Sequence, residues 1–272
     1  MELTKTQERY MMKSEIKRSI FQTEKVDIII PFHGEQGKLS NLIRDIIFCV
    51  KSNPYRITVV DDASPEKLTH NSKGLVEELQ HFDKNRPVGT IPILQAIRSE
   101  KHLGFGGAVR YGLKNTKYPW VLVMHSDCSV NQPNFMFEMG KCLLRNRTQR
   151  VGLVTARSNN PKTGDPRVKG TNSPVDDIIL TDDFAPLFCF MCPRELFETI
   201  GGLCEYPYTG YEDEEFYHRM KVKGFKQAIC GNSWVKHEGG GTMNRLLKNE
   251  EILQEVSKNR DRCISDLKHL YK

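Results

Sequence analysis

The sequence has no hydrophobic run that approaches the roughly 20 residues needed for a membrane-spanning helix. Its first 19 residues, MELTKTQERYMMKSEIKRS, mix acids and bases without an apolar stretch, so we expect no secretory signal peptide. Internal repeats and low-complexity tracts are also missing. The chain has 272 residues, of which 38% are hydrophobic, and a mean hydropathy of −0.51. A soluble protein with one large or two small domains is expected.

Cysteine pairs at metal-binding or redox spacing are scarce. The eight cysteines are scattered, and only Cys189 and Cys192 form a Cys-x-x-C pair. That pair has no second pair at zinc spacing and no adjacent redox context. Several other cysteines lie inside apolar runs. We therefore expect buried, reduced thiols, which favours a cytoplasmic location.

A strong charge of either sign is missing as well. Forty basic and 34 acidic residues give a formal net charge of +6. Ordinary solvated surface can account for this mild excess. It is compatible with an anionic small molecule, a phosphorylated lipid or DNA as partner, but it requires none of them.

The sequence does contain an alternation of strand-like and helix-like segments. The runs 26–31 and 55–60 enclose a helical pattern at 39–51, which predicts a βαβ unit. Further strands are predicted at 91–97, 121–124, 151–155 and 226–231, and further helices at 68–82, 135–145, 195–200 and 212–223. The fold class is therefore α/β, with a Rossmann-like, mostly parallel central sheet flanked by helices. Residues 1–24 and 244–272 fit helical extensions.

Four groups of ionisable side chains follow predicted strands or open a predicted helix: Asp61 with Asp62, Asp127, Glu212 with Asp213, and His237. In open α/β sheets, ligands bind at the carboxyl edge of the strands. We therefore expect these groups to converge on one site. Each group also has a purely structural interpretation, because acids often cap helices and stabilise turns.

Two of these residues are candidate metal ligands. Asp127 offers the hard oxygen that Mn²⁺ and Mg²⁺ prefer. His237 offers an imidazole, which favours Mn²⁺. The alternatives are a helix-capping aspartate and a histidine that only makes structural hydrogen bonds.

The acids at the start of the predicted helix 212–223 suggest proton transfer. One carboxylate of Glu212 and Asp213 can take a proton from an acceptor hydroxyl. The alternative is that both acids only stabilise the free N–H groups of the first turn.

The glycine-rich stretch HLGFGGAVRYGL, residues 102–113, predicts a close backbone approach at a helix N-terminus. Gly104, Gly106 and Gly107 suit a diphosphate or ribose placed near that terminus. Arg110 follows on the helix, where it can face the same ligand. Tight packing of the helix against the protein itself explains the glycines equally well.

Taken in order, these segments resemble the glycosyltransferase family 2 proteins with the GT-A fold. The resemblance covers about residues 26–241. Six stretches carry it, namely VDIIIPFHG, ITVVDDASP close to the family's VVDDGS, HLGFGGAVRYGL, VLVMHSDCS at the family's DxD, FETIGGLCEYPYTGYEDEEFYHRMKVKGFK, and WVKHEGGG at the closing H-x-G.

The resemblance implies single, inverting transfer of a sugar from a nucleotide-sugar donor, most often uridine-linked. The donor site would comprise Pro31, Phe32, Asp61, Asp62, Gly104, Gly106, Gly107, Arg110, Ser126 and Asp127. Asp127 and His237 would bind the metal. Asp213 would be the general base, beside Glu212, and Arg219 would brace their helix or face the diphosphate. Residues 25–243 would form the catalytic domain, with a nucleotide-sugar half at 25–130 and an acceptor half at 131–243.

Two departures from the family pattern bear on the mechanism. His125 stands at the first acid of DxD, and Cys128 follows Asp127, so fewer hard ligands are present. The Q-x-x-R-W sequence of processive synthases is missing, which favours a single transfer.

The acceptor is open at this stage. Residues 157–181 are polar and contain three prolines, which predicts a mobile lid or acceptor loop. A glycan is expected as acceptor, and a modified base of viral DNA is a minority alternative. The competing functions are a sugar-phosphate nucleotidyltransferase and a non-catalytic module that binds nucleotide-sugars or nucleic acid. The oligomeric state is left open.

Overall fold

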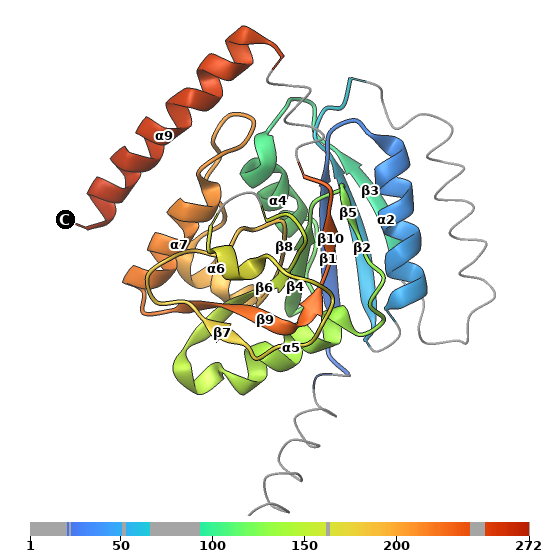
Figure 1. Ribbon diagram of the computed structural model, residues 1–272. Helices are drawn as coiled ribbons and strands as arrows, with labels where there is room; N and C mark the ends of the chain where they lie inside the picture. Colours follow the sequence, from blue (N-terminus) through green and yellow to red (C-terminus); the bar gives the residue numbers. More distant parts are fainter. Residues whose placement is uncertain are drawn as a thin grey trace, which may run out of the picture.

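The fold is built around one eight-stranded mixed sheet, seen in a computed structural model (Figure 1). The structure describes residues 21, 23–50, 53–65, 93–161, 164–239 and 248–271. The strand order is β3-β2-β1-β4-β8-β6-β9-β7. The predicted helix 68–82 and nearly all of the predicted N-terminal arm 1–24 lie outside the described residues.

One half of the sheet is parallel, as predicted. It contains β1 (Val26–Phe32), β2 (Tyr55–Asp61), β3 (Ile93–Arg98) and β4 (Trp120–Met124). β1 pairs in parallel with β2 and β4, and β2 with β3. The carboxyl ends of these strands therefore meet at one edge of the sheet.

The other half is mixed. β8 (Cys189–Pro193) runs antiparallel to β4 and to β6 (Val151–Arg157). β9 (Lys226–Trp234) is parallel to β6, and the short β7 (Ile178–Ile179) is antiparallel to β9. An α/β fold with a large central sheet is thus confirmed, and the antiparallel β8 is an addition to the prediction.

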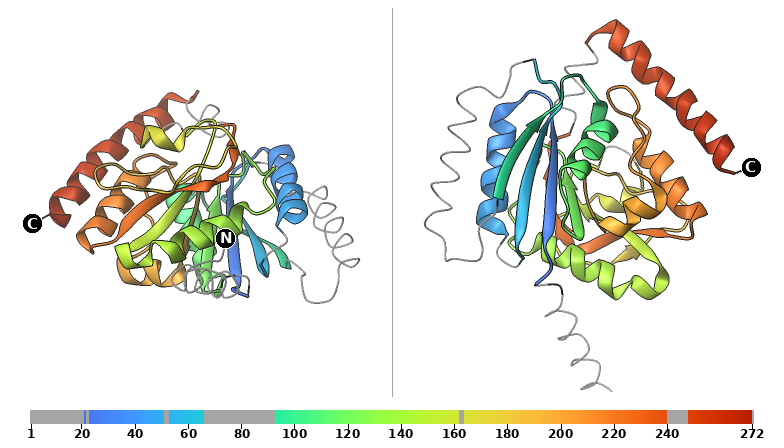
Figure 2. Two further views of the ribbon diagram at one scale, coloured as in Figure 1. Left: turned by 60° about the horizontal axis from the view of Figure 1, so that its bottom comes forward. Right: turned by 180° about the vertical axis from the view of Figure 1, so that it is seen from behind.

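Alternating residues of the strands belong to two hydrophobic layers, one on each face of the sheet. Ile28 and Ile30 of β1 join the layer that contains α2 (Gln36–Cys49) and α5 (Phe135–Arg145). Ile29 joins the other layer, with α4 (Gly104–Lys114), α6 (Arg194–Ile200) and α7 (Glu212–Val222). This period of two follows from the strand pleat, so the helices cover both faces of the sheet (Figure 2).

A second, two-stranded sheet lies beside the end of β4. β5 (Cys128–Ser129) pairs antiparallel with β10 (Lys236–His237), so that His237 lies opposite Cys128. The pairing brings a late segment of the chain to the turn that follows β4. The 3-10 helices η1 (Arg147–Gln149) and η2 (Pro166–Val168) complete the short elements.

The predicted C-terminal helix is present as α9 (Glu250–Leu270), which packs on α7 (Figure 1). Asn249 caps it, since its side chain accepts from the N–H groups of Glu251 and Ile252. Part of the predicted loop 157–181 is structured, because η2 and β7 lie inside it.

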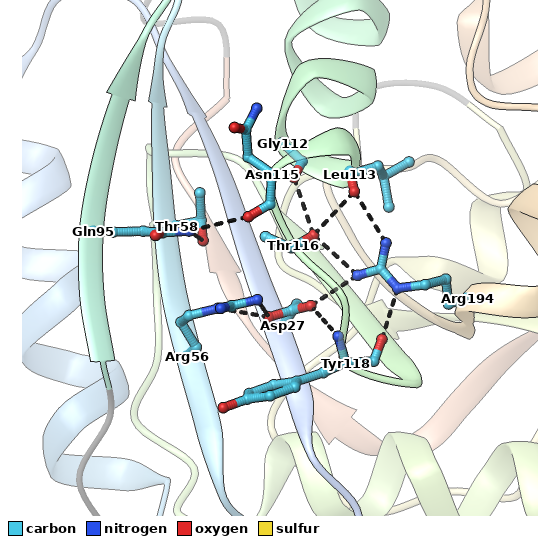
Figure 3. A network of polar contacts seen from close by, with 10 residues as sticks. All are labelled: Asp27, Arg56, Thr58, Gln95, Gly112, Leu113, Asn115, Thr116, Tyr118 and Arg194. Atoms are coloured by element: carbon cyan, nitrogen blue, oxygen red, sulfur yellow. Dashed lines mark hydrogen bonds and ion pairs between the residues drawn. The ribbon is translucent and has the colours of Figure 1, made fainter.

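A buried ion-pair network anchors the amino end of β1 (Figure 3). The side chain of Asp27 is fully buried and pairs with Arg56 and Arg194, each at 2.8 Å. It also accepts from the backbone N–H of Tyr118 at 2.6 Å. Since parallel strands carry their carboxyl ends at the opposite edge, this network lies away from the predicted site.

The cysteines are all free, and six of the eight are buried. Burial raises the pKa of the Cys263 thiol to about 12, and it also raises the pKa of Cys128, Cys189 and Cys192. Burial of the thiols is thus found for six of the eight, and the reduced state in the cell stays a prediction. Among the described residues, no helix combines the length and apolar character needed to cross a bilayer.

Candidate active site

Three side chains that can ligate a metal meet at the carboxyl end of β4. The ligand atoms of His125, Asp127 and His237 all lie within 4.8 Å of one another. Asp127 Oδ1 is 3.3 Å from His237 Nε2, and the two imidazole rings are 5.3 Å apart. We call this group the His-Asp-His cluster. One carboxylate oxygen and two imidazole nitrogens are a donor set suited to Mn²⁺.

The backbone holds this cluster from two sides. The N–H of Glu238 donates to the carbonyl of Asp127 at 3.2 Å, which extends the β5–β10 pairing to the cluster. The N–H of His125 donates to the carbonyl of Phe188 at 2.8 Å. The ring of Phe188 stacks on His237 at 4.9 Å. The cluster therefore depends on three segments that are distant in sequence.

The hydrogen bonds of His237 prepare it for a cation. Its Nδ1 is 2.9 Å from the carbonyl of Asn160. A carbonyl only accepts, so Nδ1 carries the hydrogen and the neutral ring has its lone pair on Nε2. Nε2 is buried and makes no hydrogen bond. A lone pair that faces a carboxylate oxygen at 3.3 Å is repelled unless a cation or a proton lies between them. A carbonyl that accepts from the outer N–H of a ligating histidine, and so orients its ring, is typical of metal sites.

The charges within the cluster also favour a bound cation. Burial and the neighbouring His237 lower the pKa of His125 to about 4, so its imidazole is neutral at neutral pH. Burial alone would raise the pKa of Asp127, but the adjacent imidazole of His237 holds it well below its ordinary value. The cluster therefore offers one carboxylate and two imidazole rings, of which that of His125 is neutral.

His125 is the ligand candidate that the sequence analysis missed. Its position was interpreted as the loss of an acid from the family's DxD pattern. In the structure it occupies a place in the cluster, two residues before Asp127. The spacing His-x-Asp was the available signal, because the first and third residues of a short turn can point to the same side.

Two carboxyl groups open α7, of which Glu212 is buried and Asp213 is half-buried. Burial raises the pKa of Asp213 to about 6, although the N–H of Leu187, which donates to it at 3.1 Å, and His237 act in the opposite direction. Burial and the charge of Asp213 raise the pKa of Glu212 to about 8. One acid is thus neutral and the other ionised at pH 7. Such a split is typical of catalytic pairs.

The segment 187–188 connects the two parts of the site. The N–H of Leu187 binds the carboxylate of Asp213, and the next residue, Phe188, contacts both histidines of the cluster. The sequence analysis assigned no role to this segment. In the structure it connects Asp213 to the His-Asp-His cluster.

Asp61 and Asp62 are used by the protein itself. Asp61 pairs with Arg98 and accepts from the N–H of Ser64 at 2.9 Å. Asp62 accepts from the N–H groups of Leu103 and Gly104 at 2.6 and 3.0 Å, at the start of α4. Asp61 thus stabilises a turn and Asp62 caps a helix, as the structural interpretation of these acids predicts. A contact with a nucleotide stays a prediction.

The glycines of α4 are required by packing. A Cβ on Gly104 would lie 2.6 Å from the carbonyl oxygen of Tyr206, and one on Gly106 would lie 1.9 Å from that of Cys204. A Cβ on Gly107 would be 2.8 Å from the Cβ of Leu103. The close backbone approach that the sequence predicts is therefore made to the chain's own loop. Binding of a diphosphate or ribose here stays a prediction.

The remaining predicted residues are placed as follows. Arg110 pairs with Glu205 at 2.9 Å, with both side chains largely exposed. Pro31 and Phe32 end β1, where the carbonyl of Phe32 accepts from the N–H of Asp62. Ser126 lies half-buried in the turn between His125 and Asp127. Their roles toward a donor stay predictions.

Arg219 braces α7, which was one of its two predicted roles. It pairs with Glu215 of the same helix at 2.5 Å. It also donates to the carbonyls of Ile200 and Gly202 at 2.7 and 2.8 Å. The C-terminal half of α7 is thereby fixed to the end of α6.

Aromatic and imidazole side chains line the carboxyl end of β1 and β2. The rings of His33 and His102 are 4.5 Å apart, and Tyr208 lies 5.0 Å from His102. His102 Nδ1 is 2.7 Å from the carboxylate of Asp62. The sequence analysis assigned no role to His33, although it follows the predicted strand directly.

The comparisons with known proteins agree with this arrangement. Residues 27–201, more than half of the chain, match the profile of the family described as Glycosyl transferase family 2. Solved structures with the same fold share only 12–15% sequence identity, so they inform on the fold alone.

Three of these structures are complexes. GalNAc-T7 with UDP, GalNAc and Mn²⁺ has a TM-score of 0.58 and 15% identity over 79% of this chain and 44% of that one. The mannosyltransferase PcManGT from Pyrobaculum calidifontis, with GDP-Man and Mn²⁺, has a TM-score of 0.59 and 13% identity, and the match covers 97% of this chain and 79% of that one. S. aureus TarS with UDP-GlcNAc has a TM-score of 0.55 and 13% identity, and the match covers 81% of this chain and 60% of that one. The chain thus spans less than half of GalNAc-T7.

Proposed function

Because this chain belongs to glycosyl transferase family 2, we propose that it transfers a sugar from a nucleotide-sugar donor to an acceptor hydroxyl. The observation that carries the proposal is the His-Asp-His cluster beside an ionised carboxylate at the start of α7. The family assignment alone does not specify donor or acceptor. The site chemistry supports a displacement in which a carboxylate accepts the proton of the acceptor hydroxyl while negative charge grows on the departing nucleoside diphosphate.

The first element of the proposal is a divalent cation held by His125, Asp127 and His237. The buried Nε2 of His237 fits such an ion, since it has no hydrogen-bond partner and lies 3.3 Å from the carboxylate of Asp127. A mixed oxygen and nitrogen set favours Mn²⁺ over Mg²⁺. When bound, the cation would neutralise charge on the departing nucleoside diphosphate.

The second element is Asp213 as general base. With a pKa of about 6, Asp213 is ionised at pH 7 and still basic enough to accept a proton. The N–H of Leu187 orients its Oδ2, which leaves Oδ1 to face the acceptor hydroxyl. Glu212 stays protonated next to it, so no second negative charge competes for the proton. An attack opposite the leaving group gives inversion at the sugar carbon.

The third element is the donor pocket at the ends of β1, β2 and α4. Pro31, Phe32, Asp61, Asp62 and Ser126 stand at this edge. The three glycines and Arg110 belong to the adjoining helix. A UDP-linked sugar is the first donor to test, because GalNAc-T7 and TarS were solved with uridine nucleotides. PcManGT was solved with GDP-Man, so a guanosine donor belongs in the same screen.

For the acceptor, we propose a glycan, with a base of viral DNA as the alternative. The acceptor side would be formed by residues 131–243 of the proposed catalytic domain 25–243. The net charge of +6 permits an anionic acceptor. A cytoplasmic location fits the free, buried cysteines and stays a prediction.

The test is a donor screen that follows release of nucleoside diphosphate. Purified protein is mixed with UDP-, GDP- and other nucleotide-sugars, with Mn²⁺ or with EDTA. Asp127→Ala and Asp213→Asn are run beside Asp261→Asn, a matched change at an exposed position of α9. We expect one donor to be turned over, with activity lost in EDTA and in the first two variants only.

A non-catalytic binding module is the second candidate, and a sugar-phosphate nucleotidyltransferase is the third. Binding of a nucleotide-sugar without release of diphosphate, whatever acceptor is supplied, would favour the module. Release of pyrophosphate from a nucleoside triphosphate and a sugar phosphate would favour the nucleotidyltransferase. Salt-sensitive binding of DNA would support DNA as acceptor or ligand.

A further inference from the structure

The C-terminal helix α9 is bonded to the 206–211 loop, the segment that leads into α7. Asn259 of α9 is fully buried. Its Nδ2 donates to the carbonyls of Pro207 and Thr209 at 2.9 and 3.1 Å. Its Oδ1 accepts from Arg262 at 2.6 Å. Both amide hydrogens are thus used on this one loop.

A second side-chain bond joins α9 to the same loop. The hydroxyl of Tyr206 donates to Asp266 at 2.7 Å. Between Asn259 and Asp266 lies Cys263, which is buried, so this face of α9 is in close contact with the protein. A third link joins α9 to α7 itself, because the hydroxyl of Tyr271 is 2.7 Å from Nδ1 of His218.

The opposite side of the 206–211 loop rests on α4. The N–H of Phe105 donates to the carbonyl of Tyr208 at 2.9 Å. Gly104 has no side chain, which lets the carbonyls of Tyr206 and Tyr208 come close. The loop is therefore held between the start of α4 and the buried face of α9.

The backbone of the loop is strained. Tyr208 and Tyr211 have φ angles of 64° and 73°, in the left-handed region that side chains disfavour. Gly210, with φ at 115°, lies between them. Such conformations persist only where surrounding contacts over-determine them. The bonds from Asn259 reach the carbonyls on both sides of Tyr208.

The strained loop determines where α7 begins. Tyr211 is the N-cap of α7, and its carbonyl accepts from the N–H of Glu215 at 3.0 Å. The N–H of Gly210 donates to the carboxyl of Glu212. Asp213 is the next residue. A shift of the loop is therefore transmitted directly to the two acids of the active site.

We propose that α9 is a clamp on the 206–211 loop and that Asn259 is a positioning residue for Asp213. The reasoning rests on the proposed function, since it assigns the proton transfer to Asp213. Residues 250–270 lie outside the part of the chain that matches the family profile, which ends at residue 201. The catalytic acid would thus be positioned by a helix that the family profile does not cover.

The test replaces the amide donors of Asn259 without changing its size. Asn259→Asp keeps an acceptor for Arg262 but loses both bonds to the loop. Tyr206→Phe removes the other bond and is the milder variant if Asn259→Asp does not fold. Arg260→Gln, at an exposed position of α9, is the control. For each protein, kcat, the KM for the donor and the amide hydrogen exchange of residues 204–213 are measured.

We expect faster exchange across 206–213 in both variants and a fall in kcat of about tenfold to a hundredfold in Asn259→Asp, as for a displaced catalytic group. The KM for the donor should change by less than about threefold, because ground-state binding is not the step affected. Asn259→Gln keeps the two amide N–H donors on a side chain that is longer by one methylene. Its kcat should therefore be higher than that of Asn259→Asp and lower than that of the wild type.

Two results would overturn the clamp. Unchanged exchange at 206–213 would mean that α9 does not hold the loop. Faster exchange with unchanged kcat would mean that the contact is only structural. If the wild-type protein turned over no donor at all, the proposed function would fail, whereas the exchange measurement would still decide whether α9 restrains the loop.

Discussion

Asp27 should be among the most sensitive positions for stability, although it lies far from the site. Its carboxylate is fully buried and receives two bonds from Arg56, one from Arg194 and one from the N–H of Tyr118 (Figure 3). In Asp27→Ala, both guanidinium groups keep their positive charge but lose their counter-ion. They are 13% and 15% exposed, so water can hydrate them only in part.

The expected loss follows from removing one partner of a buried ion pair. Such changes cost about 3–5 kcal/mol, mainly because a buried charge is left uncompensated. For a chain of this size, each kcal/mol lowers the melting temperature by about 2–4 °C, so a fall of roughly 10 °C is expected. Chemical denaturation with urea gives the free energy of unfolding directly.

The matched control is Glu205→Gln, which breaks the exposed pair with Arg110. Their charged groups are 2.9 Å apart, and an exposed pair of this kind contributes about 0.2–1 kcal/mol. A loss below about 1 kcal/mol in Asp27→Ala would refute the reasoning, since it would mean that water reaches both arginines. The kcat of the folded variant should equal that of the wild type.

The remaining predictions concern the site. Asp213→Asn should lower kcat by about 10²–10⁴-fold, the usual contribution of a general base, while donor affinity measured by calorimetry stays the same. Because burial raises the pKa of Asp213 to about 6, the carboxylate is lost as pH falls through 6, and kcat should fall about tenfold per pH unit below it; a pH-independent rate between 5 and 7 would contradict this. His237→Ala and His125→Ala should each weaken Mn²⁺ binding in the presence of nucleoside diphosphate, measured by calorimetry; an unchanged affinity in His125→Ala would remove it from the ligand set. Glu212 binds its proton more tightly in the folded state than at its ordinary pKa of 4.5, so stability should fall as pH rises from about 4.5 to 8; Glu212→Gln should flatten that slope in urea titrations.

Much of the fold was predictable from local patterns. The runs that became β1, β2 and β4 are short, apolar and rich in β-branched residues, and each is followed by a polar turn. The helix 135–145 was predicted with the bounds that α5 has in the structure. Periodicity did not reveal that β8 runs antiparallel. A strand buried on both faces has the same apolar composition in either direction.

The site was predictable in its chemistry but not in its contacts. Strand ends and a helix start indicated the acids and His237. The sequence also indicated that Asp61 and Asp62 could have purely structural roles. In the structure Asp61 pairs with Arg98, and Asp62 accepts a hydrogen bond at the start of α4. The glycines of α4 are explained by the loop 204–208, which no local pattern could place beside them.

The sequence by itself determined β1, β2, β4 and the helices α5 and α7, and therefore which polar groups stand at the sheet's carboxyl edge. These features depend on neighbouring residues, through the strand and helix periods. Only the tertiary structure decided that His125 joins Asp127 and His237, because β10 must first pair with β5. It also decided the hydrogen position on His237 and the split pKa values of Glu212 and Asp213. Those properties arise from burial and from contacts between distant segments, which local patterns do not encode.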